Sequence, residues 1–337
     1  MIMIVKMWPL QKESTANQYT SLILHDVIEY KPHKWNLKNV LDMRFDIFHM
    51  HWPETYLNLP KRYQQLIGTL CVVLFLVVCK LFSKKIVWTV HNFKPHENHN
   101  NIKISEFFRT FLVRMVDKFI FLTEVSKDEF LKIYNIDNSR LTVIHHPLYQ
   151  VNECCHDISA ANHSSINNKY LFFGLIRPYK NIELLMNEFI KYDSDSVLII
   201  MGGCSNTLAT ELRNMKKKID FKERIKFKFG YYNEQQLQQE LNQCKGVIIP
   251  YSDIMNSGVL YRAITAGVNV LLPRIRYTEE VVNSLKYQGA VFYDPPLDTN
   301  DIATFNGIPS VNHNNFDVDT YNTYIKNAHY ELYQTII

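Results

Sequence analysis

Residues 170–186 read YLFFGLIRPYKNIELLM. The apolar run Tyr170–Phe173 has the length and composition of a buried strand, and Gly174 follows it directly. Arg177 and Lys180 come next, just before a segment with the pattern of a helix. Two cations beside a helix N-terminus favour a bound anion, because the first N–H groups of a helix carry partial positive charge. The segment therefore predicts a diphosphate-binding site.

A second segment of the same kind lies further along the chain. The apolar strand Gly246–Tyr251 runs through Asp253 into Ser257 and Gly258, and a helix is expected over Val259–Ala266. Backbone N–H groups at a helix start are oriented donors for negative charge. We therefore predict that this second segment binds the same diphosphate as the first.

Strand and helix patterns alternate along almost the whole chain, which is typical of α/β proteins with parallel sheets. In the first half, strands are expected at Met1–Lys6, Asp46–His51, Ile86–His91, Phe119–Thr123 and Leu141–His145, and helices near Gln18–Glu29, Lys61–Phe82, Ile104–Val116 and Ser126–Tyr134. In the second half, strands are expected at Tyr170–Phe173, Val197–Met201, Ile225–Phe229, Gly246–Pro250, Asn269–Leu272 and Ala290–Tyr293, and helices near Asn181–Lys191, Thr207–Ile219, Asn233–Gln243, Val259–Ala266, Thr278–Leu285 and Asp317–Gln334. Ser126 followed by Glu129 has the pattern of a capping box, which predicts a helix start at Ser126.

The alternation is interrupted by the polar stretch Gln150–Asn168, which is rich in Asn, Ser and His. We therefore expect two domains, since 337 residues can build two separate cores. The predicted division is a first domain at 1–150, a linker at 151–168, a second domain at 169–312 and a C-terminal helix at 313–337.

Composition is that of an ordinary globular protein, with 47% hydrophobic and 21% charged residues. The charge is uneven: residues 1–150 contain 19 Lys and Arg against 13 Asp and Glu, and the remainder has a net charge of −2. A basic first half suits an anionic membrane surface or a phosphate-bearing acceptor. No nucleic-acid-binding motif accompanies it, so we expect no nucleic-acid partner.

The six cysteines form no CxxC pair, and two of them are adjacent in the polar stretch. The short apolar start at Met1–Val5 is followed at once by Lys6, so it predicts a first strand and no signal peptide. Reduced thiols and a cytoplasmic location are expected.

The run Leu66–Cys79 is uncharged, with Lys61 and Arg62 before it and Lys80, Lys84 and Lys85 after it. As a helix its 14 residues would extend about 21 Å, short of the roughly 30 Å hydrocarbon core of a bilayer. A buried helix of an α/β layer is the favoured interpretation. An interfacial helix that contacts the inner face of the membrane, and a true span, are the alternatives.

Two further strands end in polar clusters. The segment DIFHMHWPE at 46–54 ends in His51, Trp52 and Glu54, and the segment IVWTVHNFKPHE at 86–97 ends in His91 and Glu97. Ligands of open parallel sheets bind beyond the carboxyl ends of the strands, so these side chains are candidates for a second half of the site.

Together these segments resemble glycosyltransferases of the GT-B fold, of the family 4 type that builds bacterial surface polysaccharides. The resemblance implies two Rossmann-like domains that face a cleft, with the last helix crossing back to the first domain. It also implies a hexosyltransferase that uses a nucleoside-diphosphate sugar, a lipid-linked or saccharide acceptor, and no metal or other cofactor.

The resemblance also implies roles for individual residues. Arg177, Lys180, Ser257 and Gly258 would bind the donor diphosphate; Tyr231, Tyr232 and Asp253 the nucleoside. Glu54 or Glu97 would act as a base or hold the acceptor, and His91 would contact the transferred sugar. Asn17, in the segment Asn17-Gln18-Tyr19, would line the acceptor side with His51 and Trp52.

The chain departs from the family pattern at two places. The glycine-rich first loop is missing, and the two glutamates that usually stand on the donor loop and helix, with seven residues between them, are replaced by Ile254 and Arg262. The stereochemistry of transfer and the ribose contact therefore stay open. The Asn256-Ser257-Gly258 variant resembles a subset that often includes mannosyltransferases.

Each candidate also has a purely structural interpretation. The two cations could be a solvated pair, Ser257 only a helix cap, the two tyrosines core or rim, the glutamates structural, and His49 and His51 packed side chains. Other functions stay open as well: an epimerase or hydrolase of the sugar nucleotide on the same fold, or a non-catalytic nucleotide-sugar-binding subunit. A metal-dependent hydrolase is a further alternative, based on His49, His51 and His91 with His96 and His99.

Overall fold

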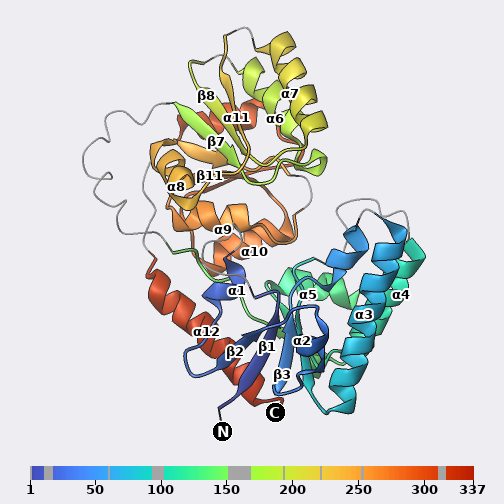
Figure 1. Ribbon diagram of the computed structural model, residues 1–337. Coiled ribbons are helices and arrows are strands. Elements are labelled where there is room, and N and C mark those ends of the chain that lie inside the picture. The colour runs from blue at the N-terminus through green and yellow to red at the C-terminus, as the bar shows by residue number, and fades with distance from the viewer. Residues whose placement is uncertain are drawn as a thin grey trace. The chain divides into compact units, whose positions relative to one another are not determined.

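The computed structural model describes residues 2–10, 18–59, 61–92, 102–150, 168–192, 194–220, 222–251, 254–309 and 316–337. The chain divides into two compact units (Figure 1). Unit 1 comprises Met1–Pro147 together with Asp319–Ile337, and unit 2 comprises Leu148–Val318. Residues 151–167 of the predicted linker lie outside the described residues.

Unit 1 is a parallel sheet with helices between its strands. Its elements are β1 Ile4–Trp8, α1 Tyr19–Leu22, β2 Glu29–Pro32, α2 Leu37–Leu41, β3 Ile47–Met50, the 3₁₀ segment η1 Pro53–Asn58, α3 Arg62–Leu81, β4 Lys85–Thr89, α4 Ile102–Met115, β5 Lys118–Phe121, α5 Glu124–Leu131, η2 Asn138–Arg140, β6 Leu141–Val143 and, from the C-terminus, α12 Val318–Gln334. Within the described residues the sheet has six strands in the order β2-β1-β3-β4-β5-β6.

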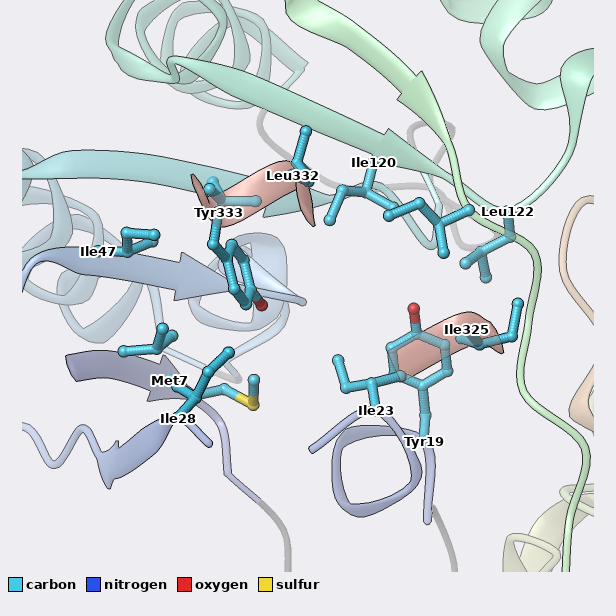
Figure 2. Packing of buried hydrophobic residues seen from close by; sticks show 13 residues of the cluster. Met7, Tyr19, Ile23, Ile28, Ile47, Ile120, Leu122, Ile325, Leu332 and Tyr333 are labelled. Carbon is cyan, nitrogen blue, oxygen red and sulfur yellow. The ribbon is translucent and has the colours of Figure 1, made fainter. Parts of the chain in front are cut away.

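The C-terminal helix α12 is part of the core of unit 1. Ile325, Leu332 and Tyr333 are buried with side chains from β1, β3 and β5 (Figure 2). The Tyr333 hydroxyl lies 2.6 Å from His49 Nδ1 of β3, so a polar contact accompanies the apolar one. A buried hydrogen bond of this kind fixes the helix in one register as well as stabilising it.

Unit 2 has the same α/β plan. Its elements are β7 Lys169–Phe173, η5 Pro178–Lys180, α6 Ile182–Lys191, β8 Val197–Gly202, α7 Asn206–Ile219, β9 Ile225–Phe229, α8 Glu234–Gln243, β10 Gly246–Ile248, α9 Gly258–Thr265, β11 Asn269–Pro273, α10 Arg276–Ser284, β12 Ala290–Tyr293 and α11 Thr299–Gly307. The order of the strands in the described part of the sheet is β12-β11-β10-β7-β8-β9, and every pair is parallel. This is the doubly wound order of dinucleotide-binding folds, so the predicted α/β class with two Rossmann-like domains is confirmed.

Two predictions about helices were wrong, and one strand and two helices were not predicted. The helix expected over Gln18–Glu29 is only the short α1, and the edge strand β2 begins at Glu29. The helix expected to start at Ser126 starts at Glu124, because Thr123 is its N-cap and Ser126 is the third helical residue that completes the capping box. The helices α2 and α11 were not anticipated.

Candidate functional site

The two segments that predict a diphosphate site end at the same edge of one sheet. Strand β7 precedes the first segment and β10 the second, and the two strands are hydrogen-bonded neighbours, with Gly246 opposite Tyr170 and Val247 opposite Leu171. The chain runs outward from this pair in opposite directions, toward β8 and toward β11. Such a reversal in strand order opens a crevice at the carboxyl ends, where ligands of doubly wound sheets bind.

Lys180 is a buried cation at this edge, and its side chain is only 7% exposed. Its ammonium lies 5.0 Å from the centroid of the Tyr251 ring and 5.9 Å from that of Phe172. Among the described residues no carboxylate pairs with it. Burial, and secondarily the positive charge of Arg177, lower the pKa of Lys180 to about 8. A buried charge without an anionic partner is costly, and a bound anion would remove that cost.

The position of Gly174 shows how close Lys180 lies to helix α9. Gly174 has φ +102°, and a Cβ placed on it would lie 3.0 Å from Val259 Cγ2 and 3.7 Å from Lys180 Nζ. The ammonium and the first turn of α9 are therefore both within 4 Å of one point. The next residue, Asn181, links this segment to the end of the β10 segment, because its side-chain amide donates to the Pro250 carbonyl at 3.1 Å.

Ser257 and Gly258 form the start of α9. Ser257 is the N-cap, its hydroxyl accepts from the Leu260 N–H at 3.4 Å, and its own N–H donates to the Tyr277 hydroxyl at 3.0 Å. Gly258 is the first helical residue, and a Cβ there would lie 2.7 Å from the Tyr149 hydroxyl oxygen. Ser257 is therefore a helix cap, as its structural interpretation proposed. The N–H groups of the first residues after it, Gly258 and Val259, have no partner inside the helix.

The remaining predicted donor residues differ in their environments. Arg177 is half-buried and is the residue before η5. Tyr232 is also half-buried: burial raises its pKa to about 12, and a hydrogen bond with the Gly174 backbone acts in the opposite direction. Tyr231 is 78% exposed and makes no ring contact within the described part of the chain.

Arg262 and Ile254 occupy the positions of the missing glutamates, and both are buried. Arg262 pairs with Glu234 of α8 at 2.6 Å and donates to the Gln150 carbonyl at 3.0 Å. Its guanidinium also lies 5.7 Å from the centroid of the Tyr149 ring. Arg262 thus ties α9 to α8 and to the start of unit 2, which is a structural role.

In unit 1 the structure brings together His51, Trp52 and His91, each just past the carboxyl end of a strand. His51 Nδ1 lies 3.3 Å from His91 Nε2, and the Trp52 ring stacks on His91 at a centroid distance of 4.3 Å. Burial lowers the pKa of both histidines well below the ordinary value, so both are neutral near pH 7. Within the described residues His51 Nε2 has no hydrogen-bond partner.

Tyr19 and His146 also belong to this cluster, although the sequence patterns did not point to them. Tyr19 is the first residue of α1. The centroid of its ring lies 4.6 Å from that of the His91 ring and 5.0 Å from that of the His146 ring. Tyr19 stands in the segment predicted to face the acceptor, where Asn17 was chosen instead. His146 directly follows the strand expected at 141–145, so the rule for strand ends would have found it.

Glu54 lies in η1, and its Oε2 atom is buried without a hydrogen-bond partner in the described residues. Burial raises the pKa of this carboxyl to about 7, and the charge of Arg109 acts in the opposite direction. A carboxyl with such a pKa exchanges a proton near neutrality, which suits a general base. The described residues show no contact between Glu54 and the two histidines.

His49, by contrast, is a structural residue. Both its ring nitrogens have partners: Nδ1 contacts the Tyr333 hydroxyl, and Nε2 lies 2.8 Å from Thr89 Oγ1. Across the described part of the chain no group of three or more His, Cys, Asp or Glu side chains could hold a metal ion. Of the other candidates, Asn17, Glu97 and Asp253 lie outside the described residues, as do His96 and His99.

No protein-family model matches the chain. Among curated proteins, it is 27% identical over 249 residues to a GDP-mannose:glycolipid 4-beta-D-mannosyltransferase of Xanthomonas campestris pv. campestris. The match covers 72% of this chain and 65% of that relative. The chain thus spans less than two thirds of the length of the curated relatives it matches.

Solved structures of similar fold cover nearly all of the chain. Anabaena HepE in complex with UDP and glucose is 14% identical, with a TM-score of 0.65 over 98% of this chain and 100% of that one. WaaG, a glycosyltransferase involved in lipopolysaccharide biosynthesis, is 9% identical, with a TM-score of 0.61 over 97% of this chain and 99% of that one. The resemblance to GT-B glycosyltransferases is therefore confirmed at the level of the fold.

Proposed function

We propose that the chain is a glycosyltransferase that moves a hexose from a nucleoside-diphosphate sugar to a lipid-linked or saccharide acceptor. One observation carries the proposal: the buried Lys180 ammonium, without a carboxylate partner in the described residues, beside the N-terminus of α9. An anion at this point would pair with the cation and accept from the first N–H groups of the helix. The related mannosyltransferase and the complex of HepE with UDP and glucose support a sugar nucleotide as that anion.

In this proposal the donor site stabilises the departing diphosphate. Lys180 and Arg177 supply fixed positive charge, and the N–H groups that follow Ser257 supply oriented donors. Removing one such group commonly costs about 3 kcal/mol of transition-state stabilisation. Because these groups already neutralise the diphosphate, we expect the reaction to need no divalent metal. Tyr232, next to Gly174, is the better placed of the two tyrosines to contact the nucleoside.

The acceptor half of the reaction is assigned to unit 1. Glu54 is the proposed base for the acceptor hydroxyl, because its carboxyl has a pKa of about 7. His91, whose ring contacts both Trp52 and Tyr19, is the proposed contact of the transferred sugar, with His51 on the acceptor side. A glycolipid acceptor is suggested by the name of the curated relative, and surface polysaccharide synthesis in the cytoplasm is the proposed setting.

The experiment combines binding and turnover. The purified chain is heated with UDP, GDP, CDP, UDP-glucose and GDP-mannose, and one of these should raise the melting temperature. A ligand at 100 times its Kd stabilises a protein by about 2.7 kcal/mol. Turnover of that sugar nucleotide is then measured with and without a glycolipid or saccharide acceptor.

The outcomes separate the remaining functions. Sugar transfer that depends on the acceptor supports the proposal. Consumption of the donor without an acceptor indicates an epimerase or hydrolase, and binding without turnover indicates a non-catalytic subunit. If none of the nucleotides shifts the melting temperature, the donor site is wrong.

A further inference from the structure

Helix α3 exposes a continuous apolar face. Its sequence from Leu66 to Cys79 carries no charge, so the helix is apolar on all sides. Such a helix is normally buried, yet one whole face of this one is exposed. The exposed face is formed by Tyr63, Leu66, Ile67, Leu70, Leu74, Val77 and Leu81, and Leu66, Ile67, Leu70, Leu74 and Leu81 are between 52% and 77% exposed. At 100° per residue these side chains span an arc of roughly 100°, along a helix about 30 Å long.

The opposite face of α3 is part of the core of unit 1. Val72, Leu76 and Cys79 have no exposed surface, and the Phe75 ring packs edge-on against Phe48 of β3 at 4.9 Å. Lys80 near the C-terminus pairs with Asp117 at 2.6 Å. The favoured interpretation, a buried helix of an α/β layer, therefore holds for this inner face alone, since only a third of the most apolar part of α3 is buried.

This packing also argues against a membrane span, although α3 is long and apolar enough for one by composition. To cross a bilayer the helix would have to leave the sheet and expose the β3 side chains that it covers. Leaving these large apolar side chains without their cover would cost free energy. A mode of binding that keeps the inner face packed and covers only the outer face avoids that cost.

The charges around α3 identify the surface that would cover it. Residues 61–85 contain five Lys and Arg and no Asp or Glu. Lys61 and Arg62 are exposed at the beginning of the helix, and Lys84 and Lys85 follow its end. Anionic lipid headgroups complement such a pattern, because apolar side chains enter the acyl boundary while flanking lysines reach the phosphates. A second copy of the same face would bring cations close to cations, and the segment 61–85 holds no acid of its own to pair with them.

We propose that the exposed face of α3 docks unit 1 onto an anionic bilayer surface, with the helix lying in the plane of the headgroups. This goes beyond the proposed function, since it depends on neither the donor site nor the identity of the sugar.

The test is flotation of the purified chain with vesicles of phosphatidylcholine that contain about 30% phosphatidylglycerol, compared with phosphatidylcholine alone. The double variant Leu70→Glu/Leu74→Glu should bind at least about tenfold more weakly than the wild type. The matched control is Val27→Glu/Ile133→Glu, which places the same charges at exposed apolar positions of unit 1 outside α3. The control should bind as the wild type does, and all three proteins should have similar melting temperatures.

A second variant, Lys61→Ser/Arg62→Ser, examines the charge. It should lower binding to the anionic vesicles more than binding to phosphatidylcholine alone, and about 1 M salt should have the same effect on the wild type. Alkaline carbonate should release the chain from the vesicles, because a chain bound at the surface does not span the bilayer.

Four results would overturn the proposal: no vesicle binding by the wild type, equal losses in the α3 variant and its control, retention after carbonate, or a dimer in solution that the α3 variant dissociates. Such a dimer would show that the exposed face of α3 binds a second copy of the chain. Nucleotide binding is measured on the same variants. A chain that binds vesicles but no nucleotide would contradict the proposed donor site and leave the membrane proposal intact.

Discussion

The replacement Lys180→Met should stabilise the free protein while it abolishes donor binding. In the folded protein the pKa of Lys180 is lowered from 10.5 to about 8, chiefly by burial. A difference of about 2.5 units corresponds to roughly 3 kcal/mol of unfavourable free energy for the charged form, at 1.36 kcal/mol per unit. Methionine keeps the length of the apolar stem and removes the charge, so up to about 3 kcal/mol of stability at pH 7 should be gained.

The gain should depend on pH in a defined direction. Below pH 8 the lysine is charged in both the folded and the unfolded chain, and the folded state carries the whole cost. As pH rises from 8 to 10.5 the folded protein loses this proton before the unfolded chain does, so the wild type becomes more stable across that window. The advantage of Lys180→Met is therefore largest near pH 7 and disappears above pH 10.5.

Donor binding should change in the opposite sense. In the wild type the ammonium gains an anionic partner, and a charge-assisted hydrogen bond contributes about 1.5–3 kcal/mol, or roughly 10–100-fold in Kd. Lys180→Met should therefore bind the nucleoside diphosphate at least about tenfold more weakly. Wild-type affinity should also fall as pH rises through about 8. Lys180→Arg, which stays charged, should not show that fall.

The assay is thermal or urea unfolding at about pH 7 and pH 10, with and without the best nucleotide, beside calorimetric Kd values. A gain of 1 kcal/mol corresponds to about 2–4 °C in a domain of this size. The control is Lys217→Met, which removes an exposed charge of α7 in the same unit and should change neither quantity. A Lys180→Met protein that is less stable than the wild type at pH 7, or that still binds the nucleotide normally, would refute the reasoning.

Three further predictions follow from the site. Arg177→Ala should lower kcat/KM for the donor at least about tenfold with an unchanged circular dichroism spectrum, because a fixed charge on the leaving diphosphate is lost; a wild-type rate would remove Arg177 from the donor site. Transfer should continue in excess EDTA, and complete loss that Mg²⁺ or Mn²⁺ restores would contradict the proposed role of the two cations. Glu54→Gln should abolish most transfer but leave donor Kd unchanged, and it should remove the rise of the wild-type rate with pH through about 7, where the Glu54 carboxylate ionises. Normal transfer by Glu54→Gln would make Glu97 the better candidate.

The alternation of strands and helices could be predicted from the sequence because its signals are local. The strand Tyr170–Phe173, the glycine after it and the cap at Ser257 all depend on residues a few positions apart, and the structure has these elements where they were expected. Where local signals competed, prediction failed: Thr123 and Ser126 can both cap a helix, and only the folded chain selects Thr123. The edge strand β2 was missed because its side chains lack a run of buried apolar residues.

The tertiary structure decided what these segments do together. Strands β7 and β10 are far apart in sequence, and only the hydrogen bonds between them bring Lys180 to the first turn of α9. Burial was likewise not a local property: the sequence showed that Lys180 is a cation, whereas Phe172 and Tyr251 make it a desolvated one with a lowered pKa. The same holds for α3, whose apolar run is evident in the sequence but whose exposed face is not. Local patterns depend on nearest neighbours along the chain, while desolvation and exposure depend on which distant elements cover a side chain, and only folding determines that.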